Sequence, residues 1–362
     1  MKNFRWLLFI SSVILISCSS NKSDDIQQPT STDYSDYNKI TLDGSAKLSI
    51  PRVGLCAAAA GNKIIFAGGG DETGGGIYSS IADIYDISTN TWTTAQLSQA
   101  RYHLAAAAAG NKIVFAGGLS GTGASYSKVV DIYDASTNTW TTAQLSQARG
   151  RLAAAAAGNK IAFAGGDIGG NYVNTVDIYD VSTNTWTTAH LSVGRRRLAG
   201  AAAGTKILFA GGETTDGAAS NIVDIYDVST NVWSTAKLSE PRYDEAGAGN
   251  NRKIVFAGGG ENSTADIYDI QNNTWSELSI SEDRKYTTAT AAGTKIVFGG
   301  GGTTNTVDVY DINTNSFSTL QCSAIVEDAA IAGVKNKILF GGGYDIEKNI
   351  VSNIIDIYTL TK

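Results

Sequence analysis

Polar side chains able to bind a ligand recur at one register of the sequence, and their chemistry changes from copy to copy. The register lies two residues after an Arg that opens six copies of a repeat, with Val326 in its place in the seventh copy. A residue that recurs builds the scaffold, whereas one that varies on a rigid scaffold is suited to binding. Arg151 and Arg197, in neighbouring copies, could each hold a carboxylate through two parallel hydrogen bonds. The candidate binding residues are His103, Arg151, Arg197, Asp244, Tyr286 and Asp328.

Residues suited to metal, thiol or phosphate chemistry are sparse. The chain has 2 His and 3 Cys, and it contains neither a His-Glu-x-x-His nor a Cys-x-x-Cys motif, which are common zinc-binding patterns. Its Gly pairs are followed neither by Lys-Ser/Thr nor by a predicted helix, so they are not phosphate-binding loops. The recurring Asp-x-Tyr-Asp motif is interpreted as a strand-end cap rather than a calcium site. We therefore assign no catalytic residue, no metal and no cofactor.

Composition favours a folded, turn-rich β protein. Of the 362 residues, 43% are hydrophobic, 40 are Gly and 3 are Pro, which is unlike disordered or collagenous chains. The formal net charge is −6, with 28 basic against 34 acidic residues. This balance gives no electrostatic attraction toward phosphate backbones, so no nucleic-acid partner is expected.

Residues 1–18 have the pattern of a secretory signal: Lys2 and Arg5 precede an apolar run, residues 6–16, too short to span a bilayer. The run ends in Leu-Ile-Ser-Cys, which resembles the lipobox of bacterial lipoproteins and implies lipidation of Cys18. An ordinary signal with an incidental Cys is the alternative. The following Ser residues favour the outer membrane, and Ser-Asp-Asp at 23–25 resembles an export signal of Bacteroidetes lipoproteins. Residues 19–38 are predicted to be a flexible tether, so the lipid is the only membrane anchor.

Three further anchors recur in fixed order after residue 39. A short apolar run ends in Phe and a Gly pair, a later segment carries Asp-x-Tyr, and the last carries a large aromatic residue. The Gly pair and the Asp-x-Tyr triplet each occur seven times, but the aromatic residue occurs only six times, as Trp92, Trp140, Trp186, Trp233, Trp275 and Phe317. The segments are short, β-branched or aromatic, and bounded by Gly, Asn and Ser, which predicts four strands, a to d, in each repeat.

The ordered Arg, Gly pair, Tyr and Trp resemble the kelch repeat over residues 39–362. That resemblance implies an all-β, seven-bladed kelch-type β-propeller. Residues Lys39 to Ser49 precede the first strand a and are predicted to supply strand d of the last blade, which closes the ring. Ile40 or Leu42 would then replace the Trp, so we expect looser packing in that blade. The domain order is signal 1–18, tether 19–38 and propeller 39–362.

The expected binding face combines the b-to-c loops, which vary in length, with the starts of strand a. In kelch domains that bind peptides, the start of strand a lines the channel mouth, so one basic arc and an opposite acidic or aromatic arc are expected there. In the alternative interpretation, Arg197 merely pairs with Asp244 of the next blade. The leading function is a lipid-anchored, monomeric module of the outer membrane that binds a protein or a glycan, including an acidic one. The alternatives are a sugar-modifying enzyme resembling bacterial kelch-type sialic acid mutarotases, and a scaffold subunit of a surface complex.

Overall fold

The computed structural model describes residues 37–71, 77–121, 125–260 and 263–362. Two units divide the chain, Met1–Thr32 and Asp33–Lys362, and the second contains the whole repeat region. The predicted signal, the lipidated Cys18 and nearly all of the predicted tether lie outside the described residues. No helix long and apolar enough to cross a membrane occurs in the described part of the chain.

Each repeat forms one antiparallel sheet of four strands. In the second blade these are β6 (Ala105–Ala109), β7 (Lys112–Ala116), β10 (Val129–Asp134) and β11 (Thr139–Gln144), in the order β11-β10-β7-β6. Tight turns join them, with φ of 55° at Gly110 and 56° at Asn138, a conformation that Gly and Asn adopt most readily. The sheet therefore follows directly from the alternation of apolar segments and Asn/Gly turns.

Six further four-stranded sheets occur among the described residues. Blade 1 contains β2 (Cys56–Ala60), β3 (Lys63–Ala67), β4 (Ile81–Asp86) and β5 (Thr91–Gln96); blade 3 contains β12 (Ala153–Ala157), β13 (Lys160–Ala164), β16 (Thr175–Asp180) and β17 (Thr185–His190). Blade 4 contains β19 (Ala199–Ala203), β20 (Lys206–Ala210), β22 (Ser220–Asp227) and β23 (Val232–Arg242); blade 5 contains β24 (Glu245–Gly249), β25 (Lys253–Gly258), β26 (Thr264–Asp269) and β27 (Thr274–Ser279). Blade 6 contains β28 (Thr288–Ala292), β29 (Lys295–Gly299), β30 (Thr306–Asp311) and β31 (Ser316–Gln321).

The last blade combines the two ends of the repeat region. Its strand order is β1-β37-β34-β33, from β1 (Lys39–Lys47), β37 (Ile354–Thr361), β34 (Lys337–Gly341) and β33 (Ala330–Val334). This pairing agrees with the predicted closure. Leu42 lies opposite Tyr358, where Trp92 lies opposite Tyr85 in blade 1. Leu42 is 40% exposed, which agrees with the expectation of looser packing in this blade.

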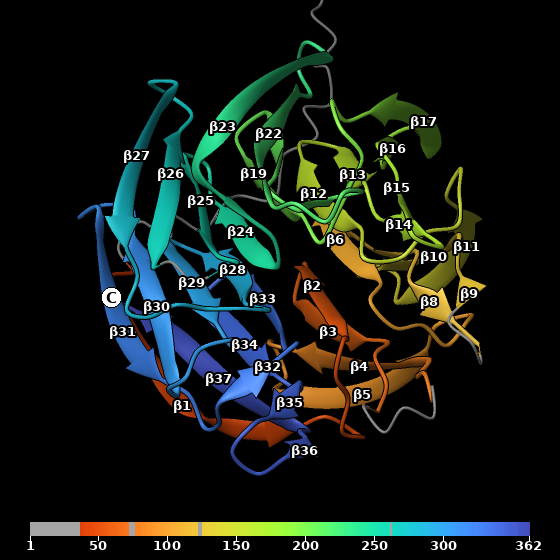
Figure 1. Ribbon diagram of the computed structural model, residues 1–362. Helices are drawn as coiled ribbons and strands as arrows, with labels where there is room; N and C mark the ends of the chain where they lie inside the picture. Colours follow the sequence, from red (N-terminus) through yellow and green to blue (C-terminus); the bar gives the residue numbers. More distant parts are fainter. Residues whose placement is uncertain (1–36, 72–76, 122–124, 261–262) are drawn as a thin grey trace, which may run out of the picture. The chain divides into compact units, whose positions relative to one another are not determined.

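The seven innermost strands form a ring around a common axis (Figure 1). Each contacts the next in the order β2, β6, β12, β19, β24, β28 and β33, and β33 returns to β2. Ala fills most of these strands, although it favours helices in isolation. These Ala residues form strands here because the inner strands lie close together around the axis, where only small side chains fit.

The recurring Arg is buried and structural, as its recurrence predicted. Arg101 is fully buried and donates through Nη1 to the carbonyls of Gly117 and Val129, at 2.9 and 2.8 Å, while Nη2 bonds Asp131 of the Asp-x-Tyr triplet. Removing one partner of such a buried pair typically costs about 3–5 kcal/mol. Blade 7, which has no Arg at this register, instead satisfies Asp356 through Ser323.

The segments between strand d and strand a share one face with the b-to-c loops, as predicted. Backbone bridges join the two sets, for example between Tyr102 and Leu119 and between Gly150 and Asp167. Short strands extend this face: β8 (Leu119–Ser120) with β9 (Ser125–Tyr126), β14 (Asp167–Ile168) with β15 (Asn171–Tyr172), β18 (Arg195–Arg196) with β21 (Glu213–Thr214), and β32 (Val326–Glu327) with β35 (Tyr344–Asp345) and β36 (Ile350–Val351).

Candidate functional site

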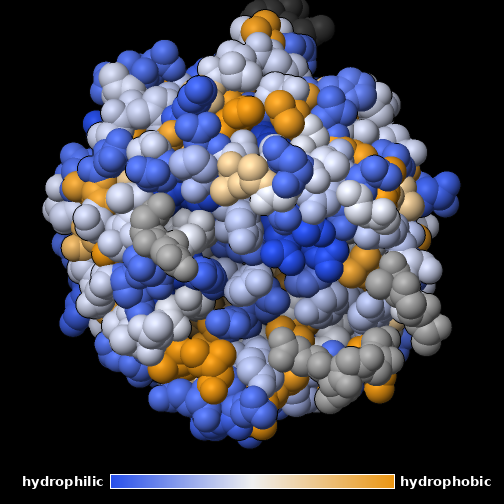
Figure 2. Space-filling model, in the orientation of Figure 1, coloured by the Kyte–Doolittle hydropathy of each residue, from blue (hydrophilic) through white to orange (hydrophobic). Residues whose placement is uncertain are grey.

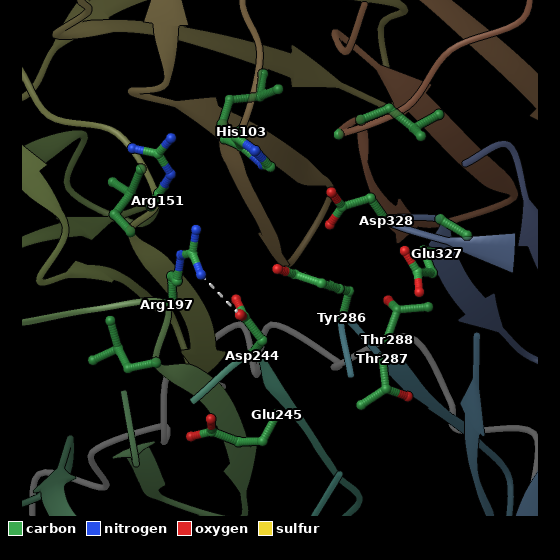
Figure 3. A pocket seen from close by; sticks show the side chains of 16 residues that line it. His103, Arg151, Arg197, Asp244, Glu245, Tyr286, Thr287, Thr288, Glu327 and Asp328 are labelled. Atoms are coloured by element: carbon green, nitrogen blue, oxygen red, sulfur yellow. Dashed lines mark hydrogen bonds and ion pairs between the residues drawn. The ribbon is translucent and has the colours of Figure 1, made fainter. Parts of the chain in front are cut away.

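The structure brings all the predicted site residues to one cavity of about 430 Å³ on this face (Figure 3). They come from six successive blades, and Gly54 supplies the seventh position of the same register. Figure 2 shows that the surface around the centre of this face is mostly hydrophilic. That these residues bind a ligand stays a prediction. The residues are His103, Arg151, Arg197, Asp244, Tyr286 and Asp328.

A shared backbone conformation presents these side chains to the cavity. All seven positions have φ between 49° and 61°, in the left-handed region. The N–H of His103 donates to the carbonyl of Gly54 at 3.0 Å, and the N–H of Arg197 donates to that of Arg151 at 3.1 Å. Equivalent bonds join Asp328 to Gly54, His103 to Arg151, and Arg197 to Asp244. Because the conformation occurs in every blade, it belongs to the scaffold, and only the side chain distinguishes one blade from the next.

Both pocket Arg residues are already paired with acids. Nη1 of Arg197 lies 3.1 Å from Oδ2 of Asp244 in the next blade, and Nη1 of Arg151 lies 3.2 Å from Oδ2 of Asp167. The alternative pairing of Arg197 with Asp244 is therefore present. Asp167 also accepts a hydrogen bond from the Tyr126 hydroxyl at 3.0 Å. The sequence analysis did not identify Asp167, which directly follows the Gly pair in its blade.

His103 does not contribute positive charge to the predicted basic arc. Burial, followed by the nearby charges of Arg151 and Arg197, lowers the pKa of His103 to about 3. The imidazole is therefore neutral at physiological pH, so His103 adds no positive charge to the predicted basic arc. The basic arc consists of Arg151 and Arg197.

Acidic residues line the opposite arc of the cavity. Glu327 and Asp328 of blade 7 face the two Arg residues across the pocket, and the Tyr286 hydroxyl lies between the two sides (Figure 3). The pocket therefore offers cationic donors on one side, carboxylate acceptors on the other and a hydroxyl between them.

Two neighbouring acids on the blade 5 side have raised pKa values. Burial raises the pKa of Asp244 to about 6, and Glu213 acts in the same direction, while Arg197 opposes them. Burial raises the pKa of Glu245 to about 8, opposed by the backbone N–H groups of Glu245 and Ala199 and by Arg242 and Arg195. Both groups therefore change charge near neutral pH.

Glu245 and Glu327 are acidic pocket residues that sequence reasoning missed, and Glu245 is the more unusual of the two. Its side chain is buried, and among the described residues neither carboxylate oxygen has a hydrogen-bond partner of normal geometry, although the backbone N–H groups of Glu245 and Ala199 lie near enough to oppose the rise in its pKa. A signal for it was present in the sequence, because the equivalent position is Leu in four blades. These residues are Leu55, Leu104, Leu152 and Leu198.

No metal centre is present among the described residues, where no group of three or more His, Cys, Asp or Glu side chains could hold an ion. Both described thiols are free: Cys322 is buried and Cys56 is half-buried. Burial raises the pKa of the Cys56 thiol to about 12 and that of Cys322 to about 11. Such thiols are poor nucleophiles at neutral pH.

Comparison with known proteins agrees with this architecture. Residues 30–196 match the family model described as the KLHDC2/KLHL20/DRC7 Kelch-repeats domain. The fold is a kelch-type β-propeller. A solved structure entitled "Structure of YjhT" is similar to this propeller, with a TM-score of 0.60 and 15% identity over 76% of this chain and 99% of that one. At this identity the likeness shows the fold alone. No curated protein sequence matches the kelch propeller described here.

Proposed function

We propose that the protein is a lipid-anchored binding module of the cell envelope whose pocket takes a sugar that carries a single carboxylate, at the end of a glycan. The observation that carries this proposal is the division of the pocket into two arcs. Arg197 can bind the carboxylate through paired hydrogen bonds. Glu327 and Asp328, on the opposite arc, can accept hydrogen bonds from sugar hydroxyls.

The size and charge of the pocket support this class of ligand. A cavity of about 430 Å³ falls within the range of ordinary small-ligand sites. A polyanion would meet the carboxylates of Glu327 and Asp328, which repel additional negative charge. One acidic group on an otherwise neutral, hydroxyl-rich ligand fits both arcs.

The position of the first described strand supports an anchored arrangement. Lys39, at the start of β1, pairs with Thr361 at the end of strand c of the last blade. The carbonyl of Tyr37 accepts a hydrogen bond from Thr294 Oγ1, at 3.1 Å, in an a-to-b turn. These turns lie opposite the pocket, so a tether that precedes Lys39 joins the propeller on the far face.

A second candidate is a sugar-modifying enzyme of the sialic acid mutarotase type. Asp244 and Glu245 favour it, because their pKa values of about 6 and about 8 suit groups that transfer protons near neutral pH. Exchange between the anomers of a free acidic sugar, followed by NMR with and without the protein, distinguishes the enzyme from the binding module.

The binding proposal is tested on glycans that end in sialic acid or a uronic acid, with lactose as the neutral comparison. Arg197→Gln should weaken binding of the acidic glycans about 30-fold, which corresponds to the ~2 kcal/mol of a desolvated Arg–carboxylate contact. Arg252→Gln, at an exposed Arg on the opposite face, should not affect it. Equal affinity of Arg197→Gln and the unaltered protein, or preference for an acidic peptide over every glycan, would overturn the proposal.

Replacing both Arg151 and Arg197 by Glu would be a less suitable test of the binding proposal. Arg151→Glu would place a second carboxylate beside Asp167, whose side chain is 2% exposed. Two like charges in a buried site destabilise the fold, so a double reversal confuses loss of binding with loss of stability. The single neutral substitution of Arg197 avoids this.

A further inference from the structure

Asp244 already pairs with the Arg197 guanidinium, which is the group that the carboxylate of the ligand needs. Both side chains line the cavity, and Nη1 of Arg197 lies 3.1 Å from Oδ2 of Asp244 (Figure 3). A carboxylate that binds Arg197 through both guanidinium nitrogens therefore meets Asp244 already in place. Two ionised carboxylates on one guanidinium repel each other, so the ligand binds more weakly unless Asp244 leaves or takes up a proton.

The two Arg–Asp pairs of the pocket differ in how readily they can open. Asp167 is 2% exposed, and its Oδ2 accepts hydrogen bonds from Tyr126, Arg151 and Arg196 at 3.0, 3.2 and 3.4 Å. The Asp244 side chain is 13% exposed, and in the described part of the chain it forms an ion pair with Arg197 alone. Asp167 is therefore a fixed part of the wall, whereas Asp244 can release its partner.

We propose that Asp244 is a built-in competitor for the carboxylate of the ligand: it holds Arg197 in the empty pocket and releases it, with uptake of one proton from solvent, when an acidic ligand enters. This inference rests on the proposed function, because it requires that Arg197 receive the carboxylate. It adds that the affinity for an acidic ligand depends on pH, and that Asp244, rather than Arg151 or His103, causes this pH dependence.

The surroundings of Asp244 support a proton-linked exchange. The charged groups that act on it are Arg197 and Arg196 of blade 4, which favour the ionised form, and Glu213 of the blade 4 loop, which opposes it. Glu245 adjoins it in the chain, and Tyr286 lies beside it in the pocket. Burial outweighs the Arg charges, so the pKa of Asp244 is raised to about 6.

The sign of the pH dependence follows from that value. Below about pH 6 Asp244 is neutral and Arg197 is available; above it, the ionised Asp244 competes with the ligand. Because apparent affinity scales with the fraction of competent protein, binding should weaken about tenfold for each pH unit above 6, or about 30-fold at pH 7.5. Glu245, which ionises near pH 8, must be separated from this effect by substitution.

The experiment measures affinity for sialyllactose and for a glucuronate-terminated disaccharide by calorimetry from about pH 5 to about pH 8, with lactose as the neutral ligand. Asp244→Asn should bind both acidic ligands at pH 7.5 about 30-fold more tightly than the unaltered protein, with a flat pH profile. Asn is suited to the site because the φ of 59° is one that Asn tolerates. Glu277→Gln, which removes one charge from the exposed outer strand β27 of blade 5, should keep the original pH dependence.

The outcomes separate this inference from the proposed function. Titration in two buffers of different ionisation enthalpy should show uptake of up to one proton on binding above pH 6 by the unaltered protein and none by Asp244→Asn. Binding with the same pH profile in both proteins overturns the competitor role and leaves the proposed function standing. A profile that flattens in Glu245→Gln instead assigns the proton to Glu245 and also overturns it. Absence of binding by both proteins at every pH overturns the proposed function and this inference together.

Discussion

At the scale of single residues, the most informative departure from the repeat is Glu245. A Leu at this register packs beside a Gly of the preceding blade, as Leu104 does beside Gly68, and the Glu245 carboxylate takes the same place beside Gly211. The space is therefore suited to an apolar side chain. A buried carboxyl without hydrogen-bond partners destabilises a fold, and destabilising groups that persist are commonly found at functional sites.

Glu245→Leu should raise the free energy of unfolding by about 1–3 kcal/mol at pH 7.5. The folded pKa is raised from 4.5 to about 8, so the unfolded chain ionises first as pH rises. The unaltered protein therefore loses stability between pH 4.5 and 8, and the advantage of the variant grows over the same window. Denaturant titrations at low and neutral pH measure this difference. A variant that is no more stable at pH 7.5 would show that the carboxyl group has partners in solution.

At the scale of elements, β1 is the strand on which the ring depends. It covers the outer edge of β37 and brings residues more than 300 positions apart into one sheet, with Lys39 opposite Thr361. An uncovered strand edge offers unpaired N–H and C=O groups to other chains. Each of blades 1 to 6 is built from one continuous segment and does not require pairing between distant parts of the chain.

Deletion of Lys39 to Ser49 should therefore abolish cooperative thermal unfolding or cause aggregation through the bared edge of β37. Calorimetry together with light scattering measures both. Deletion of residues 21–32 in the polar segment serves as the matched control and should leave the melting curve unchanged. If the protein without β1 melts like the control, ring closure does not depend on this strand.

At the scale of the whole molecule, the proposed membrane anchoring depends on Cys18, which lies outside the described residues. Cys18→Ser should move the protein from the membrane fraction to a soluble one, because no other apolar segment lies in the predicted mature tether. Cell fractionation with a high-salt wash measures this. A variant that stays with the membrane after the wash would indicate another mode of attachment.

The sequence by itself determined the architecture and the register that supplies six of the pocket residues. Recurrence of the Gly pair and Asp-x-Tyr predicts seven four-stranded blades, because each repeat is closed by its own short turns and needs little distant information. Recurrence also distinguishes structural Arg residues from pocket ones. Arg101 and Arg149 occupy the recurring position and are buried, whereas Arg151, two residues after Arg149, lines the pocket. The same register in successive blades must converge on one axis, so the six candidate residues meet in one cavity.

Only the tertiary structure decided the electrostatic state of that cavity. Arg197 and Asp244 lie 47 residues apart, and their contact at 3.1 Å depends on how adjacent blades pack. The same packing buries His103, which makes it neutral, and leaves the Glu245 carboxylate without a well-formed hydrogen bond to any described residue. A repeat pattern gives the position of each side chain around the ring, but the charge that it carries depends on the burial and the neighbours that blade packing creates.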